Sequence, residues 1–371
     1  MSFWARLDDL RAVAAQHPDG LVDLSQGEPV DPVPVVVRQA LTAAADAPGY
    51  PQTRGDAALR EAASTWLARS HGISMPPGQI LPTIGSKELI GLLPLLLGLG
   101  PDDAVVHPKL AYPSYATGAR LVGAEPVPAD DVTGWKPASA SGRRIRLVWL
   151  NSPSNPTGQV LPVTVLRRII DWARDHDVVV AADECYLDYG WEAMPTSILA
   201  PAAAGDSPAG VLALHSLSKR SSMAGYRAGL VSGDPGLIAR LLHVRREIGL
   251  ITPAPVQGAM IAALHDDLHV KQQRERYGRR RAALRQALAA TGWTVDHSEA
   301  GLFLWARYRT LDGRAASGRL AGNGILATPG DMYGDEGHRH VRISVTASDA
   351  QIAAACHRLE SSISAGAAPS R

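Results

Sequence analysis

Between residues 80 and 234, short runs rich in Val, Ile and Leu alternate with amphipathic segments of helical length. The runs lie at 80–85, 104–108, 125–129, 144–150, 178–183, 211–216 and 228–234. Strands that alternate with helices and are apolar at most positions form mostly parallel sheets with helices on both faces. This pattern predicts an α/β fold, and it places any ligand beyond the carboxyl ends of the strands.

After about residue 250 the pattern changes. Two long helical stretches are followed by short strands at 301–308 and 339–345, which predicts a smaller α+β unit. A chain of 371 residues is long enough for two domains. We therefore expect an N-terminal arm and part of the small domain in 1–45, a large domain in 46–255 and a C-terminal small domain in 256–371.

The composition excludes several classes of protein. A net charge of +1 gives no bulk attraction to nucleic acid or to an anionic membrane. The apolar run 89–99 is interrupted by Gly and Pro and is too short to span a bilayer. We expect no signal peptide at the N-terminus and no disulfide framework from two cysteines. We expect a cytoplasmic protein with small-molecule partners.

The strand at 211–216 ends in His-Ser-Leu-Ser-Lys, and Arg227 follows eight residues after Lys219. A lysine amine condenses with aldehydes when its ammonium is partly desolvated or lies beside other cations. Two hydroxyls, on Ser216 and Ser218, and a guanidinium suit a dianion such as phosphate. An aldehyde and a phosphate in one molecule describe pyridoxal phosphate (PLP), although Ser-x-Ser-Lys also arises by chance.

Asp183 ends the strand at 178–183, where a carboxylate is costly unless it is paired. A protonated pyridine nitrogen would pair it, and such a ring is an electron sink for a substrate carbanion. Tyr186 and Asn155, which lies in an Asn-Pro-Thr-Gly turn, can donate to an oxygen on that ring. The alternatives are a helix cap and an ordinary turn. We expect no metal, because no histidine stands at ligand spacing from Asp183.

Three further motifs point to the same ligand. Gly85, Ser86 and Lys87 join a strand to a helix, and amides at a helix N-terminus bind phosphate. Tyr112, in Ala-Tyr-Pro-Ser-Tyr, can stack on a planar ring. Arg342 can hold a carboxylate through two parallel hydrogen bonds. Taken singly, a capping tyrosine and a surface arginine on an edge strand remain alternatives.

The order of these motifs over nearly the whole chain resembles the class I/II aminotransferases, PLP enzymes of fold type I. The resemblance implies a large domain with a mostly parallel seven-stranded sheet and a smaller α+β domain. A finer resemblance, to the succinyldiaminopimelate aminotransferases of high-GC Gram-positive bacteria, rests on the stretches 21–34, 47–62, 81–90, 216–235, 252–260 and 269–284. Those enzymes exchange the amino group of N-succinyl-LL-2,6-diaminopimelate with 2-oxoglutarate in the diaminopimelate and lysine pathway.

The resemblance also implies roles for single residues. Lys219 would bond to the cofactor aldehyde and then move the substrate α-proton, while Asp183 would pair with the pyridinium. Arg342 would hold the substrate α-carboxylate, with Asn155 and the Gly27 backbone nearby. Cofactor contacts are also implied for Gly85, Ser86, Lys87, Tyr112, Asn155, Tyr186, Ser216, Ser218 and Arg227.

Tyr50 resembles the tyrosine that reaches the phosphate of the neighbouring subunit, which implies a homodimer with shared active sites. Arg54 and Lys109 lie on loops near Tyr50 and Tyr112 and are candidates for reading a distal carboxylate. Three alternatives stay open: another aminotransferase of the class, a PLP-dependent carbon–sulfur lyase, and a PLP-binding regulator or inactive homologue.

Overall fold

The computed structural model describes residues 4–366, with side chains described to residue 362. Its main sheet has seven strands in the order β2-β8-β7-β6-β5-β3-β4. Their bounds are β2 Ile80–Ile84, β3 Asp103–His107, β4 Glu125–Pro128, β5 Arg144–Asn151, β6 Val179–Asp183, β7 Val211–Ser216 and β8 Ala228–Gly233. Strand β8 pairs antiparallel with β2 and β7, and the other adjacent pairs in this sheet are parallel. The predicted fold class, an α/β chain with a mostly parallel seven-stranded sheet, is confirmed.

Alternate side chains of these strands enter two apolar cores on opposite faces of the sheet. From β5, Leu147 and Trp149 enter one core, and Val148 and Leu150 enter the other. The first face is covered by α4 (Ser86–Leu96), α5 (Ser114–Leu121) and α9 (Pro235–Glu247); the second is covered by α3 (Ala57–His71), α6 (Val163–Asp175), α7 (Pro201–Ala204) and α10 (Ala254–His265). Burial on both faces explains why the strand sequences are apolar at nearly every position.

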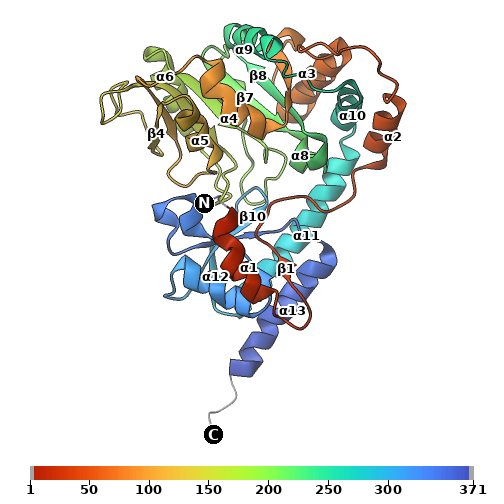
Figure 1. Ribbon diagram of the computed structural model, residues 1–371, viewed down its shortest axis with the longest axis vertical. Coiled ribbons are helices and arrows are strands. Elements are labelled where there is room, and N and C mark those ends of the chain that lie inside the picture. Colours follow the sequence, from red (N-terminus) through yellow and green to blue (C-terminus); the bar gives the residue numbers. More distant parts are fainter. Residues whose placement is uncertain (1–3, 367–371) are drawn as a thin grey trace.

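The C-terminal part carries a four-stranded antiparallel sheet in the order β12-β13-β10-β9. The strands are β9 Trp293–His297, β10 Phe303–Tyr308, β12 Thr328–Pro329 and β13 Val341–Ser344. The helices here are α11 Leu268–Ala290, α12 Gly313–Gly322 and α13 Asp349–Gly366, with short 3-10 turns η4 Gly330–Tyr333 and η5 Asp335–Gly337. Helix α11 leads from the seven-stranded part down to this smaller sheet (Figure 1).

The N-terminal segment packs against the C-terminal part. Its first described residues form η1 (Trp4–Leu7) and α1 (Asp8–Ala14). Helix α1 lies against α12, and strand β1 (Val22–Asp23) pairs with β11 (Ile325–Leu326) (Figure 1).

Helix α2 (Val35–Ala43) packs on α10, which in turn packs on α3. The division of the chain at residues 45 and 255 stays a prediction.

Within residues 4–366, no helix has both the length and the apolar content needed to cross a membrane.

Candidate active site

A cavity of about 290 Å³ lies where the main sheet faces the smaller one. It borders the carboxyl ends of β5, β6 and β7, which end at Asn151, Asp183 and Ser216. Most of the residues that the sequence singled out line it: Gly27, Ser86, Lys87, Tyr112, Asn155, Asp183, Tyr186, Ser216, Ser218, Lys219, Arg227 and Arg342. Gly27 and Arg342, which lie 315 positions apart in the chain, therefore share one cavity.

Two predicted site residues are placed differently. Gly85 does not line the cavity but lies under the Arg227 guanidinium, and a Cβ at Gly85 would come within 2.3 Å of Arg227 Nη2. Its positive φ of 73° also favours glycine. Tyr50 is 99% exposed and lies away from the cavity of its own chain.

Lys219 lies on the short helix α8 (Leu217–Arg220), directly after β7. Its ammonium donates a hydrogen bond to the carbonyl oxygen of Gly27, and its own carbonyl accepts one from Tyr189 Oη at 2.8 Å. Burial lowers the pKa of the Lys219 amine to about 8, and the Arg342 guanidinium acts in the same direction. A substantial fraction of the amine is therefore neutral near physiological pH and able to act as a nucleophile or base.

Asp183 is a buried carboxylate held by neutral donors. Tyr115 Oη donates to Oδ2 at 2.9 Å, and the Cys185 amide donates to Oδ1 at 3.3 Å. Burial raises the pKa of the Asp183 carboxyl, while the hydrogen bonds from Tyr115 and Cys185 act against this rise. No ion pair within 4 Å reaches Asp183 among the residues described. The site is therefore suited to a ligand that brings a positive charge to this carboxylate.

Two asparagines join Asp183 to the opposite side of the cavity. Asn151 Nδ2 donates to the Asp183 carbonyl at 2.9 Å, and Asn151 Oδ1 accepts from the Asn155 amide at 2.7 Å. Asn155 Oδ1 in turn accepts from Arg342 Nη1 at 2.7 Å. The two side chains fix the turn after β5, and they hold the Arg342 guanidinium close to Asn155.

Cations and hydroxyls gather at one end of the cavity, where β2 and β7 end. Ser86 and Lys87 begin helix α4, and Ser216 Oγ accepts from the amide of Ser218 at 3.2 Å. Arg227 directs its guanidinium over the start of α4 and donates to a backbone carbonyl at 2.9 Å. Such a set of amide, hydroxyl and guanidinium donors is suited to a phosphate.

Arg342 is buried on β13, between β12 and β10, so it is not a surface arginine on an edge strand. Besides Asn155, it donates to the carbonyl oxygen of Ser25. Its guanidinium carbon lies 4.1 Å from the Phe303 ring centre and 4.9 Å from that of Tyr333. Its Nε is buried without a hydrogen-bond partner in the described part of the chain. A buried unpaired donor on a cavity indicates a site for an acceptor such as a carboxylate.

Several lining residues were not found from the sequence. Tyr115 and Asn151 stand inside the motifs Ala-Tyr-Pro-Ser-Tyr and Asn-Ser-Pro-Ser-Asn, where only Tyr112 and Asn155 were given roles. Phe303 has no local motif, because its place depends on the pairing of β10 with β13. Gln26, Glu28, Ile90, Cys185 and Ala224 also line the cavity.

The two candidates for reading a distal carboxylate lie elsewhere. Lys109 forms an ion pair with Glu336 at 2.7 Å, and Arg54 lines a separate cavity beside α9.

Residues 19–359 match the family model described as aminotransferase class I and II. The chain belongs to the class I and II aminotransferases. It is 53% identical over 356 residues to the 4-dedimethylamino-4-oxo-anhydrotetracycline transaminase OxyQ of Streptomyces rimosus, covering 96% of this chain and 98% of OxyQ. It is also 53% identical over 357 residues to the "Probable aminotransferase Rv1178" of Mycobacterium tuberculosis, covering 96% of this chain and 84% of that protein.

Among solved structures, a probable N-succinyldiaminopimelate aminotransferase from Thermus thermophilus matches this aminotransferase with a TM-score of 0.85. The two are 27% identical, and the match covers 97% of this chain and 100% of that one. The resemblance to class I/II aminotransferases of fold type I is thus confirmed.

Aminotransferases of this class depend on PLP, and the described residues suit it. Lys219 offers a partly neutral amine, Arg227 and the start of α4 offer donors for a dianion, and Asp183 offers a buried negative charge. Glycine at position 85 leaves room for the Arg227 guanidinium beside α4.

Proposed function

We propose that this aminotransferase moves an amino group between an α-amino acid and a 2-oxo acid, with the substrate α-carboxylate bound to Arg342. The observation that carries the proposal is the buried guanidinium of Arg342, with an unpaired Nε, on the same cavity as the Lys219 amine. The carboxylate would add charge-assisted hydrogen bonds to a group already held by Asn155.

The proposed roles of the protein groups follow from their chemistry. Bound PLP supplies an aldehyde to which amines bond and a cationic ring that takes up the electron pair of the substrate Cα–H bond. Lys219, in its neutral form, takes the α-proton and returns it on the neighbouring carbon. Asp183 would set its negative charge against the ring nitrogen, and Tyr115 holds that carboxylate in place. Asn155 and Tyr186 would donate to the ring oxygen, and Tyr112 would stack on the ring.

For the phosphate we propose Ser86, Ser216, Ser218 and Arg227, with Lys87 beside them. Tyr50 completes this set in our proposal from a second copy of the chain, since it is 99% exposed and cannot serve its own cavity. A homodimer with shared active sites is therefore expected. Light scattering tests whether the protein is a dimer. A Tyr50→Phe variant tests the shared site, and we expect it to retain PLP more weakly. A fully active monomer would contradict both expectations.

As the substrate pair we propose N-succinyl-LL-2,6-diaminopimelate and 2-oxoglutarate. Support comes from the sequence resemblance and from the likeness to the Thermus thermophilus protein, which is described as a probable N-succinyldiaminopimelate aminotransferase. A second candidate is a substrate of the kind named for OxyQ, a polycyclic ketone that receives an amino group. The observation in its favour is the 53% identity to OxyQ over 96% of this chain.

A panel of substrates separates these candidates. The holoenzyme is mixed with one amino donor at a time, and loss of the absorbance of lysine-bound PLP is followed before and after addition of 2-oxoglutarate. The donors are N-succinyl-LL-2,6-diaminopimelate, LL-diaminopimelate, glutamate, aspartate, alanine and an aromatic amino acid. In a parallel series, 4-dedimethylamino-4-oxo-anhydrotetracycline is offered as acceptor.

We expect the succinylated donor to give the highest kcat/KM, with full return of the absorbance on adding 2-oxoglutarate. A preference for the tetracycline ketone would show that the proposed substrate pair is wrong, while the reaction would still be an amino-group transfer. Release of pyruvate and ammonia without any oxo-acid acceptor would select a lyase and contradict the proposed reaction.

A further inference from the structure

Residues 24–31, here called the strap, cross the cavity between the two sheets. Gln26, Gly27 and Glu28 line the cavity, and the Gly27 carbonyl accepts the hydrogen bond of the Lys219 ammonium. The strap therefore contacts the residue on which the proposed chemistry depends. Its own placement is then part of the geometry of the site.

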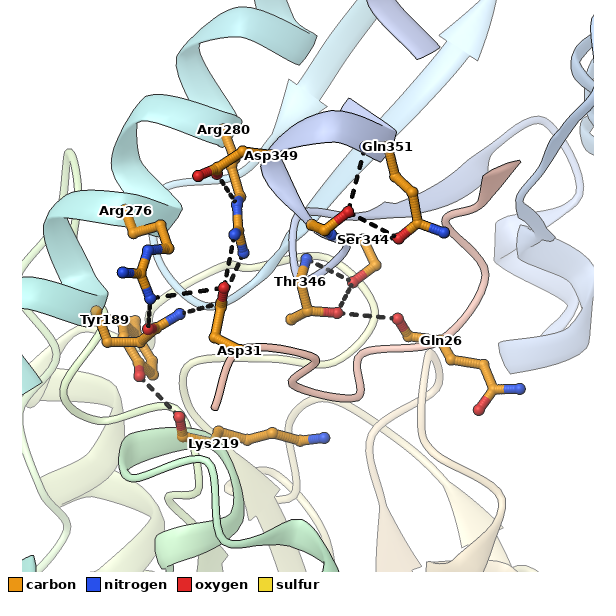
Figure 2. A network of polar contacts seen from close by, with 12 residues as sticks. Gln26, Asp31, Tyr189, Lys219, Arg276, Arg280, Ser344, Thr346, Asp349 and Gln351 are labelled. Carbon is orange, nitrogen blue, oxygen red and sulfur yellow. Dashed lines mark hydrogen bonds and ion pairs between the residues drawn. The ribbon is translucent and has the colours of Figure 1, made fainter. Parts of the chain in front are cut away.

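The N-terminal end of the strap is fixed to the smaller sheet by its backbone carbonyls. The Ser344 amide donates to the Leu24 carbonyl at 2.8 Å, and Thr346 Oγ1 donates to the Gln26 carbonyl at 3.2 Å. Between them the Ser25 carbonyl accepts from Thr328 Oγ1 at 3.0 Å and from the guanidinium of Arg342. Figure 2 shows Gln26 at the end of the chain of contacts that runs through Thr346 and Ser344.

The other end is fixed by one side chain. Asp31 accepts two hydrogen bonds from Arg280 of α11, both at 2.7 Å, and one from Gln273 Nε2 at 2.7 Å. The side chains of Asp31 and Arg280 are only 9% and 3% exposed. Figure 2 shows Asp31 reaching up to Arg276 and Arg280, with Lys219 below the strap. A bidentate pair this well buried is strong and directional.

Between these two anchors the strap has few contacts of its own. Within the described residues, no hydrogen bond holds Glu28, Pro29 or Val30, and Val30 is 54% exposed. Gly27 packs so closely on Phe303 that a Cβ would lie 2.6 Å from its ring. The position of the Gly27 carbonyl thus depends on both anchors, and the second anchor rests on a single carboxylate, that of Asp31, which pairs with Arg280 and, at 3.5 Å, with Arg276.

We propose that Asp31 and Arg280 are positioning residues, which hold the strap so that the Gly27 carbonyl stays on the Lys219 amine and the Ser25 carbonyl stays on Arg342. The inference rests on the proposed function, in which Lys219 moves the proton and Arg342 binds the carboxylate. Neither residue of the pair lines the cavity or touches the reacting atoms. Their effect passes through the backbone of the strap.

The chain offers a matched control on the same arginine. Arg280 Nε also donates to Asp349 Oδ1 at 2.6 Å, but Asp349 is 70% exposed and lies on α13, outside the strap. Asp31→Asn and Asp349→Asn each remove one carboxylate charge from Arg280. If Arg280 mattered only for the general stability of this region, both variants would change the protein in the same way.

The experiment compares hydrogen–deuterium exchange and steady-state kinetics of the holoenzymes. For Asp31→Asn we expect the amide hydrogens of the strap to exchange about tenfold faster or more. In this variant, local opening of the strap no longer has to break the ion pair with Arg280. We expect kcat/KM to fall about tenfold or more, with a rise in KM for both substrates and a fall in kcat. For Asp349→Asn we expect exchange of the strap and kinetic constants within about twofold of the unchanged protein.

Unchanged exchange and kinetics in a folded Asp31→Asn variant would overturn the proposal, and so would equal effects of the two variants. If Asp31→Asn does not fold, the variant Gln273→Ala replaces it, because this change removes one donor to the Asp31 carboxylate. Hydrogen–deuterium exchange of the strap must then be faster than in the unchanged protein. Unchanged exchange in Gln273→Ala would also overturn the proposal. The exchange measurement needs no substrate. A failed substrate panel would therefore contradict the proposed function and leave the inference on the strap to its own test.

Discussion

The two sides of the cavity are built in different ways. On one side, Asn151, Asp183 and Ser216 end strands of the main sheet, and the groups that follow them lie within a few residues of those ends. The opposite side combines Arg342 and Phe303 of the smaller sheet with the strap, which comes from the start of the chain. The first side is fixed by the sheet itself. The second is fixed by hydrogen bonds between segments far apart in sequence. We therefore expect the residues of the second side to move more than those of the first side, which stay rigid.

The largest effect is expected on the strand-end side, at Lys219. Lys219→Ala removes both the covalent attachment and the base, and we expect kcat to fall at least about 10³-fold. The variant should still bind PLP non-covalently, as seen by dialysis and absorbance, because the phosphate donors remain. Transamination at a rate close to that of the unchanged enzyme would contradict the role given to Lys219.

The second-largest loss of activity is expected for Asp183→Asn. Removing a buried negative charge from the ring nitrogen should lower kcat by about 10²–10³-fold, because the ring loses the partner that keeps it protonated. The structure of the variant should change little, since asparagine can still accept from Tyr115. The check is stopped-flow measurement of the first half-reaction with excess donor; a loss below about threefold would show that Asp183 does not act on the ring.

The depressed pKa of Lys219 gives a prediction for pH. The neutral amine is the reactive form, and with a pKa of about 8 its fraction rises about tenfold for each pH unit below 8. The rate at which PLP-free protein captures added PLP covalently should therefore rise from pH 6 to pH 8 and then level off. A rate that continues to rise up to pH 10 would mean that burial does not lower the pKa of this amine.

On the opposite side, Arg342→Lys replaces a fork of donors by a single charge. We expect kcat/KM to fall about 10- to 100-fold, mainly through a higher KM for both substrates, while PLP retention is unchanged. Asn155, whose carbonyl accepts from Arg342, also loses its partner. Equal KM values for variant and unchanged enzyme would mean that Arg342 does not bind the substrate carboxylate.

The smallest effect is expected for Tyr115→Phe. It removes one of the two donors that hold the Asp183 carboxylate, so kcat should fall about three- to tenfold. Its signature is a shift of the pH dependence of the bound cofactor's absorbance, which a mere packing defect would not cause. No shift in that titration would mean that Tyr115 serves only the core.

The same contrast explains what could be predicted from sequence. On the strand-end side the sequence singled out most of the lining residues, because a residue that ends a parallel strand is brought to the common edge by the sheet alone, although it missed Asn151 and Tyr115. Asn155 and Arg342 were both predicted, but their contact joins positions 187 apart and has no local signal. Phe303 and the pair of Asp31 with Arg280 were missed, since they depend on the pairing of β10 with β13 and on how α11 packs above the strap. Local motifs thus identify the groups to which we assign the chemistry, and long-range packing decides which residues position them.

The central claim, that PLP is carried by Lys219 in the cavity between the two sheets, is tested most directly by reducing the holoenzyme with borohydride and mapping its peptides by mass spectrometry. The predicted result is a phosphopyridoxyl group on the peptide containing Lys219 and on no other. The same group on another lysine, such as Lys87, which also lines the cavity, would contradict the account, as would a holoenzyme that takes up no label at all.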